Sequence, residues 1–257
     1  MSFEKFEIEG HPVRWFLELP STNTYLKEHP ELLDEAGQVV VTSHQTAGRG
    51  RRGRLYWSLP GKNLTFSLVL HPECPQAQLT LYALWSGIAV VRSLEVLGVA
   101  PRLKWPNDVL IGNRKVCGIL AESVWTKQGN RPALILGIGI NVLGQPQEFP
   151  AELWSMITTV AASGAKEVTP ETLLPQVLQA LDAVDRQFRE QGMATLREEW
   201  LQRSGMLGNA VRFEQQEGWK TGVVAGIGPE GALLLELTSG EVISHISGDV
   251  EWTNKEE

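Results

Sequence analysis

A glycine- and arginine-rich stretch, residues 45–54, is the part of this sequence best suited to chemistry. Residues 48–54 hold four arginines and three glycines, in a chain whose formal net charge is −7. Arginine presents a planar fork to carboxylate and phosphate oxygens, and glycine lets the backbone approach a ligand closely. The stretch therefore suits a loop that wraps a small anion. A solvated basic loop or a nucleic-acid patch is the alternative interpretation.

The flanking segments predict that this loop joins two core strands. Residues 38–43 before it and 63–70 after it are apolar and rich in β-branched or aromatic residues. The connection is roughly 20 residues long, and connections of that length are usually functional or disordered. Tyr56 and Trp57 follow the arginines directly, so they could stack on a flat ligand or simply belong to the core.

Three short polar residues, Ser21, Thr22 and Asn23, follow a predicted first strand at residues 13–19. They precede a helical pattern, and all three types are good helix N-caps. Capping is one explanation. The other is that these side chains and nearby free N–H groups bind a polar ligand head.

Two further stretches place polar residues at the ends of apolar strands. Lys104 ends a predicted strand, and a Pro-Asn-Asp turn with Asn107 follows it. A hairpin then carries Lys115 near the start of its return strand, where a lysine must reach solvent or meet an anion. A later strand, residues 133–142, contains two glycines and ends near Asn141; such glycines mark a bulge or a close backbone approach, including an approach to a ligand.

The rest of the chain predicts helices and then a group of short strands. Helical patterns cover residues 78–97, 170–191 and 193–202. After Gly205 the pattern changes to short strands with glycine-rich turns, predicted at 211–213, 220–227, 232–237, 241–246 and 250–252. We therefore expect two domains, residues 1–205 and 206–257, of which the second is a small barrel.

Composition excludes several classes of protein. No apolar run reaches the ~18 residues that a membrane span needs. Cys74 and Cys117 show no metal or redox spacing, which fits a reducing cytoplasm. The five histidines show no zinc-ligand spacing, and the acidic balance argues against nucleic acid as the main partner.

Taken together, four stretches resemble biotin–protein ligases. They are Ser21-Thr22-Asn23, residues 45–54, Lys104-Trp105-Pro106-Asn107-Asp108 with Lys115 behind it, and Gly137-Ile138-Gly139-Ile140-Asn141. The resemblance extends from about Pro12 to the C-terminus. It implies an α+β fold: a mixed/antiparallel sheet with helices, like the catalytic domain of class II aminoacyl-tRNA synthetases, plus a C-terminal SH3-like β-barrel.

The resemblance also implies a two-step reaction. Biotin attacks the α-phosphate of ATP and gives biotinyl-5′-AMP and pyrophosphate. A lysine of the biotin carboxyl carrier protein of acetyl-CoA carboxylase then takes the biotinyl group and releases AMP. Neither step needs an enzyme nucleophile, in keeping with the lack of a Ser/His/Asp or Cys/His arrangement. Mg²⁺ is expected because the phosphates need charge compensation, but its ligands are not identified.

The site residues come from the same resemblance. Lys115 and Arg51 are expected to be catalytic, Lys115 as the main cation and Arg51 as the residue that retains the adenylate. Biotin is expected to contact Ser21, Thr22, Asn23, Gln45, Gly48, Arg49, Gly50, Arg51, Lys115, Gly118, Gly137 and Gly139. ATP is expected to contact Arg49, Arg51, Arg52, Tyr56, Trp57, Lys104, Asn107, Lys115 and Asn141. The family often has tryptophan at the position of Tyr56, so either Tyr56 or Trp57 could cover the adenine.

The sequence departs from the pattern of many family members at its N-terminus. Many bacterial members of the family carry an N-terminal winged helix, whereas only 20 residues precede Ser21. We therefore expect the monofunctional, non-repressor kind. A lipoate–protein ligase and a nucleic-acid-binding regulator are the alternatives, and formation of a homodimer through sheet edges stays open.

Overall fold

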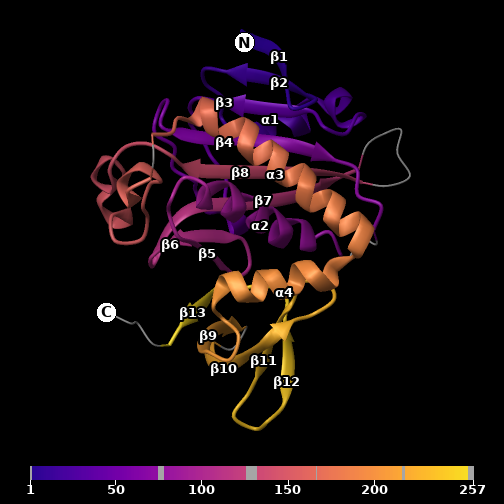
Figure 1. Cartoon of the computed structure of the whole chain (residues 1–257), viewed down its shortest axis with the longest axis vertical. Coiled ribbons are helices and arrows are strands. Elements are labelled where there is room, and N and C mark those ends of the chain that lie inside the picture. The colour runs from indigo at the N-terminus through magenta and orange to yellow at the C-terminus, as the bar shows by residue number, and fades with distance from the viewer. Residues whose placement is uncertain (1, 75–77, 126–131, 166, 216–217, 254–257) are drawn as a thin grey trace.

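A large β-sheet packed between helices forms most of the molecule, and a smaller sheet lies beside one end of it (Figure 1). The computed structural model describes residues 2–74, 78–125, 132–165, 167–215 and 218–253. The smaller sheet is built from the C-terminal residues and lies below helix α4 in Figure 1.

The large sheet has eight strands in the order β1-β2-β3-β4-β8-β7-β6-β5. Strands β2 and β3 run parallel, and all other neighbours in the sheet run antiparallel. The predicted mixed sheet is therefore confirmed. The strands are β1 (Phe3–Ile8), β2 (His11–Phe16), β3 (Val39–Thr42), β4 (Asn63–Leu70), β5 (Pro101–Lys104), β6 (Asp108–Ile111), β7 (Arg114–Val124) and β8 (Ala133–Asn141).

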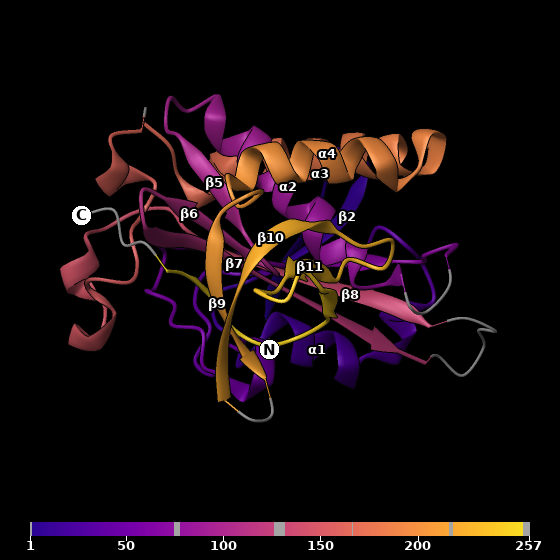
Figure 2. The ribbon, with the colours of Figure 1, turned by 90° about the horizontal axis from the view of Figure 1, so that it is seen from below.

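Helices cover the two faces of this sheet unequally. Three of them lie on one face and α1 lies on the other, as the view from below shows (Figure 2). The helices are α1 (Thr22–Glu28), α2 (Leu81–Glu95), α3 (Pro170–Gln191) and α4 (Met193–Ser204). Short 3₁₀ turns occur at η1 (Pro30–Leu33), η2 (Arg51–Gly53), η4 (Pro146–Glu148), η5 (Ala151–Leu153) and η6 (Ala161–Ser163).

Strand β4 shows how the sequence divides the two faces. Leu64, Phe66 and Leu68 are buried in the core beneath α2 and α3. The alternate residues Thr65 and Ser67 point to the other face, because successive side chains of a strand alternate. One face of the central sheet is therefore apolar, whereas the α1 face is polar at its middle.

Helices α2 and α3 follow from two different patterns. Helix α2 is buried around most of its surface, because it lies between the sheet and α3, and its sequence is apolar on most sides. Helix α3 buries one stripe that includes Leu174, Leu178 and Leu181, at the spacing of an amphipathic helix. It begins after Thr169, whose hydroxyl accepts a hydrogen bond from the N–H of Thr172.

The C-terminal sheet confirms the five predicted strands but not the predicted barrel. Its strands are β9 (Ala210–Gln215), β10 (Gly218–Ile227), β11 (Leu233–Glu236), β12 (Val242–His245) and β13 (Val250–Trp252). They pair in one antiparallel row, β12-β11-β10-β9-β13. Among the described residues no pairing joins the two end strands, so the sheet is open.

The N-terminus differs most from the sequence prediction. Residues 3–8 form strand β1, which pairs with β2 across a turn at Glu9 and Gly10. The sequence did not suggest this strand because it is short, half of its residues are charged, and most of them are exposed. The first predicted strand also ends at Phe16 rather than at residue 19. In the described part of the chain, no helix is long and apolar enough to cross a membrane.

A histidine fastens the β1–β2 turn to α3. The His11 Nδ1 lies 3.0 Å from the carbonyl oxygen of Gly37, and its Nε2 lies 3.1 Å from a carboxylate oxygen of Asp182. Both partners are acceptors, and a neutral imidazole has only one N–H. The hydrogen bond to Asp182 raises the pKa of His11 above 6.5, although burial opposes this shift.

This contact predicts a pH-dependent stability. Because the folded-state pKa of His11 is raised, its contribution is fully present below about pH 6.5 and is lost as the pH rises through the folded-state pKa. His11→Gln should therefore lower the free energy of unfolding in urea more at about pH 5.5 than at about pH 8.5. In the Asp182→Asn background, His11→Gln should have nearly the same effect at both pH values. An equal loss at both pH values would contradict the assignment.

Candidate functional site

One large cleft lies on the α1 face of the sheet, where strands β4, β8 and β7 meet the arginine loop. Its volume is about 1310 Å³. Every residue that the sequence analysis assigned to biotin or ATP lines this cleft, with the single exception of Gly48, which is buried in the loop. Motifs that lie far apart in the sequence therefore meet in one place.

The first polar cluster closes one end of the cleft. Ser21 is the N-cap of α1, and its hydroxyl accepts a hydrogen bond from the N–H of Thr24. Capping is thus confirmed, yet Ser21, Thr22 and Asn23 also face the cleft. The backbone N–H of Thr22 donates to the side-chain oxygen of Gln45 at 2.9 Å, which ties the helix start to the beginning of the arginine loop.

The two glycines of β8 make room for side chains of this same chain. A Cβ atom at Gly137 would lie 2.4 Å from the amide oxygen of Asn23, and one at Gly139 would lie 2.5 Å from the ring of Tyr56. Atoms that are not bonded to each other do not come this close, so only glycine fits while Asn23 and Tyr56 keep their positions. The close approach that the sequence predicted here is made by Asn23 and Tyr56.

Tyr56 belongs to a buried polar network. Its hydroxyl donates to the side-chain oxygen of Asn141 at 3.2 Å, and Asn63 donates to that same oxygen at 2.9 Å. Burial raises the pKa of Tyr56 above its ordinary value. Asn141 also donates to the carbonyl oxygen of Thr158, so most of its hydrogen-bonding capacity is used within the protein. Trp57, by contrast, is 48% exposed beside the cleft.

The arginine loop forms a tight hairpin over the cleft. Arg49 and Leu55 form an antiparallel bridge, and the N–H of Gly50 donates to the carbonyl oxygen of Arg54 at 2.7 Å. At the tip, Arg52 adopts a left-handed conformation with φ +56°. Gly48 is required where the hairpin closes, because a Cβ there would lie 2.4 Å from the backbone oxygen of Tyr56.

Carboxylates of the C-terminal sheet fasten the tip of this hairpin. Arg52 pairs with Glu214, and Arg54 pairs with Asp249. The hydrogen bond to Asp249 raises the pKa of Arg54, although burial opposes it. Arg51 points the other way and donates to the side-chain oxygen of Asn107 at 3.3 Å; burial lowers its pKa, while nearby Asp108 and Asp249 oppose that shift.

The lysines lie on the wall formed by β5, β6 and β7, which Arg51 of the loop contacts through Asn107. The Nζ of Lys115 is 2.6 Å from a carboxylate oxygen of Asp108, and both residues face the cleft. Lys104 lies 5.8 Å from the ring centre of Trp252, on the last strand of the C-terminal sheet. The backbone of Lys115 also bonds to residues 156 and 158, so a segment that follows β8 lies along this wall.

Sequence reasoning missed several residues of the site. Glu122 on β7 accepts a hydrogen bond from the side-chain NH₂ group of Asn23 at 2.9 Å. The hydroxyl of Ser67 on β4 donates to the side-chain oxygen of the same Asn23 at 2.5 Å. Asp108 was part of a recognised motif but had no assigned role. Alternation along β4, polar at residues 63, 65 and 67 and apolar between them, was the signal that could have revealed Ser67.

The C-terminal sheet and the segment after β8 also contribute to the cleft, which the sequence did not indicate. Their lining residues are Phe149, Leu153, Ser155, Met156, Ile157, Asn209, Ala210, Arg212, Asp249, Val250, Glu251 and Trp252. The indole N–H of Trp105 donates to the carbonyl oxygen of Gly231 at 3.0 Å, which fixes the Lys-Trp-Pro-Asn-Asp turn against that sheet.

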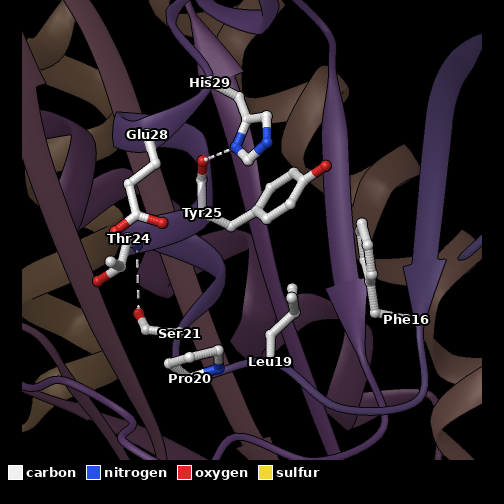
Figure 3. Close-up of a pocket in the computed structure, with 8 residues that line it drawn as sticks. All are labelled: Phe16, Leu19, Pro20, Ser21, Thr24, Tyr25, Glu28 and His29. Atoms are coloured by element: carbon white, nitrogen blue, oxygen red, sulfur yellow. Dashed lines mark hydrogen bonds between the residues drawn. The ribbon is translucent and has the colours of Figure 1, made fainter. Parts of the chain in front are cut away.

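A second, smaller pocket lies beside α1 (Figure 3). It measures about 450 Å³ and is lined by Phe16, Leu19, Pro20, Ser21, Thr24, Tyr25, Glu28 and His29. The rings of Tyr25 and His29 stack within it, with their centres 3.9 Å apart. It contains none of the cleft's arginines or lysines, so the anion-binding capacity belongs to the large cleft.

The cleft offers cations and hydrogen-bond donors rather than a nucleophile. Burial raises the pKa of the Cys117 thiol, so this cysteine stays a neutral thiol. In the described residues no group of three or more His, Cys, Asp or Glu side chains could hold a metal ion. Asp108 and Asn107 offer side-chain oxygens to the cleft but contact Lys115 and Arg51, so an ion bound there would take most of its ligands from phosphates.

Comparison with known proteins agrees with these features. The model of the biotin/lipoate A/B protein ligase family matches residues 15–141. The bifunctional ligase/repressor BirA of Bacillus subtilis (strain 168) is 31% identical over 248 residues, which cover 96% of this chain and 76% of BirA. The biotin–[acetyl-CoA-carboxylase] ligase of Paracoccus denitrificans is 35% identical over 211 residues, or 79% of this chain and 86% of that ligase.

A solved structure shows the same arrangement of the chain. The biotin protein ligase from Aquifex aeolicus in complex with biotin and ATP superposes with a TM-score of 0.78 and 31% sequence identity. The match covers 93% of this chain and 97% of that structure.

The two loop-fastening carboxylates generate a test of the hairpin. Replacing both by amides, Glu214→Gln with Asp249→Asn, should speed tryptic cleavage of the unliganded protein within residues 49–54. Each exposed pair stabilises the closed hairpin only weakly, so the loss of both pairs should raise the rate of cleavage by about 2- to 30-fold. Glu251→Gln is the matched control, because Glu251 pairs with Arg212 within the same sheet. Cleavage of the double variant at the rate of this control would contradict the fastening role.

Proposed function

Because this chain belongs to the biotin/lipoate A/B protein ligase family, we propose that it attaches biotin to a lysine of a biotin carboxyl carrier protein at the expense of ATP, through biotinyl-5′-AMP. The Aquifex aeolicus relative binds biotin and ATP, which supports these two substrates. The Paracoccus denitrificans relative is named for acetyl-CoA carboxylase, which supports that enzyme's carrier protein as the acceptor.

One observation carries the proposal: a polar pocket and a group of cations share one cleft. The polar end contains Ser21, Thr22 and Gln45, and the cationic end contains Arg51 and Lys115. A molecule with a polar head and an acid tail can bind along this cleft, with its carboxylate delivered to the cations. ATP brings a second anion to the same place, which requires positive charge to offset the repulsion.

In the first step, the biotin carboxylate attacks the α-phosphate of ATP and pyrophosphate leaves. We assign Lys115 to the developing negative charge on the carboxylate and α-phosphate oxygens. Its present partner Asp108 holds the ammonium group at the cleft wall, 2.6 Å away. Arg49 and Arg51 close over the resulting adenylate, and Gly50 between them gives the loop the freedom to do so.

The nucleotide occupies the rest of the cleft in this proposal. Lys104 and Asn107 bind phosphate oxygens, and Arg52 contributes once it exchanges Glu214 for a phosphate. Trp57 is the aromatic residue that covers the adenine, because the ring of Tyr56 is already packed against Gly139. The remaining N–H of Asn141 is available to the adenine or ribose. Mg²⁺ would compensate phosphate charge, and Asp108 and Asn107 would hold it together with the phosphates.

In the second step, the amine of the acceptor lysine attacks the mixed anhydride and AMP leaves. The backbone around Gly118 and Gly137 borders the biotin tail in this arrangement. We also propose that the chain divides into a catalytic domain, residues 1–205, and a C-terminal SH3-like domain, residues 206–257, which supports the arginine loop. As separate parts of the proposal, the protein acts in the cytoplasm without binding DNA and forms a homodimer by pairing of sheet edges.

Exchange of label between pyrophosphate and ATP tests this function directly. The assay is run with biotin, with lipoate and with neither acid. Biotin-dependent exchange is the expected result, since activation of the acid is reversible. Exchange with lipoate alone would move the assignment to a lipoate ligase, and no exchange with either acid would exclude acid activation. Steeply salt-dependent DNA binding would instead support a regulator.

The role of Lys115 yields a quantitative prediction. Lys115→Ala should lower the rate of biotin-dependent exchange by about 10²-fold or more, the scale of removing one preorganised charge stabiliser. Lys62→Ala is the control, because Lys62 is paired with Glu148 and is not part of the cleft lining. A near-normal exchange rate in Lys115→Ala would remove Lys115 from catalysis.

The role of Arg51 predicts a different defect. Arg51→Gly should still form biotinyl-5′-AMP but release it, so that lysines of an unrelated protein in the mixture become biotinylated. Arg51→Lys keeps the charge but loses the planar fork, and it should release less. Mass spectrometry of the bystander protein measures both. Intermediate retained as in the wild type would exclude this role.

A further inference from the structure

A chain of hydrogen bonds runs beneath the polar end of the cleft and reaches the hydroxyl of Thr22, which also has a longer contact, 3.4 Å, with Gln45. It links Glu122 on β7, Asn23 at the start of α1, Ser67 on β4 and Thr22. Ser67 is fully buried and lies below the cleft lining, so it does not meet a ligand itself. Because each link has a defined donor and acceptor, the direction of the whole chain can be derived from its charged end.

Glu122 sets the first direction. It lies 2.7 Å from the Nζ of Lys27 and 3.4 Å from the guanidinium of Arg49. Burial opposes ionisation of Glu122, but the hydrogen bonds from Lys27 and Asn23 and the nearby charges hold its pKa below the usual value. An ionised carboxylate only accepts hydrogen bonds. The NH₂ group of Asn23 must therefore face Glu122, at 2.9 Å.

The orientation of Asn23 then fixes the proton of Ser67. With its NH₂ group directed to Glu122, Asn23 presents its oxygen to the Ser67 hydroxyl at 2.5 Å. That oxygen can only accept, so Ser67 donates its single proton to it. The other contact of Ser67, 2.6 Å from the hydroxyl of Thr22, must run in the opposite direction. Thr22 therefore donates its proton to Ser67.

The consequence appears at the cleft surface. The Thr22 hydroxyl also lies 3.4 Å from the side-chain oxygen of Gln45, but its single proton goes to the much nearer oxygen of Ser67 at 2.6 Å. It therefore offers the ligand lone pairs alone. Gln45 shows the opposite polarity: its oxygen accepts from the Thr22 backbone N–H at 2.9 Å, which leaves its NH₂ group as a donor. One acceptor beside one donor complements a cyclic urea, which carries N–H donors next to a carbonyl acceptor.

We propose that Ser67 is a positioning residue for substrate specificity, which acts through Thr22 by keeping that hydroxyl an acceptor for a ureido N–H. This inference rests on the proposed function, because it assigns the urea ring of biotin to this end of the cleft. Glu122 supplies the charge that orients the relay, and Asn23 and Ser67 transmit that orientation. Space is limited around the relay. Ser67 on β4 lies opposite Gly137 on β8, and Asn23 already fills the space that a side chain at Gly137 would need.

Ser67→Ala tests the relay, measured by biotin-dependent exchange and by calorimetric binding of free biotin. Without Ser67, the Thr22 hydroxyl can rotate and present its proton to the ligand. The KM and Kd for biotin should rise about 2- to 13-fold, the loss of roughly one net hydrogen bond. The kcat should stay within about twofold, because the cations that act on the phosphate are untouched.

Ser86→Ala is the matched control. Ser86 is also fully buried, but its hydroxyl bonds to the carbonyl oxygen of Tyr82 within α2, and it is not part of the cleft lining. It should cost stability without changing the KM for biotin. If Ser67→Ala proves unstable in urea, Ser67→Cys keeps the side-chain shape with a much weaker donor, and the same rise in KM is expected.

An analogue separates the relay from a merely structural effect. A biotin methylated on its ureido nitrogens has no N–H to give to Thr22, so Ser67→Ala should weaken its binding less than it weakens the binding of biotin. Equal losses for both compounds, a KM equal to that of Ser86→Ala, or a fall in kcat at unchanged KM would overturn the proposal. A wild-type protein inactive with biotin would instead refute the proposed function, so the two failures are distinguishable.

Discussion

The absence of two side chains on strand β8 is the constraint on which the site depends. Gly137 and Gly139 point to the α1 face of the sheet, where Asn23 and Tyr56 occupy the space that their Cβ atoms would need, at 2.4 and 2.5 Å. Asn23 brings the start of α1 onto the sheet, and Tyr56 brings the end of the arginine loop onto it. Larger residues on β8 would push both segments away, and the cleft would lose its polar end and its lid together.

Electrostatic pairing explains how an acidic chain maintains a dense group of cations. Most of the cleft cations have a carboxylate partner: Arg49 has Glu122, Arg54 has Asp249, and Lys115 has Asp108. These pairs are exposed or partly exposed to solvent, so an anionic substrate can replace the carboxylates. Arg51 differs, because it donates to the neutral oxygen of Asn107 and is half-buried. It is the arginine that an incoming phosphate would engage with least competition.

The sequence predicted the composition of the site far better than its connections. Residue types at short spacing identified the arginine loop, the Lys-Trp-Pro-Asn-Asp turn and the β8 glycines, because each has a strong local signature. Ser67 and Glu122 were missed because their importance comes from contacts with Asn23 across the sheet. Strand β1 was missed because it is short, half charged and mostly exposed. The small barrel was inferred from five short strands, but only tertiary structure decides how such strands pair, and the barrel is not confirmed.

The central claim is that one cleft binds the biotin head and the adenylate phosphate together. Calorimetric titration with a stable analogue of biotinyl-5′-AMP, compared with biotin alone and AMP alone, tests this claim most directly. The account predicts that the linked compound binds about 10²- to 10⁴-fold more tightly than either part, because both ends of the cleft are engaged at once. A linked compound that binds no better than biotin would show that the polar end and the cations do not form one site.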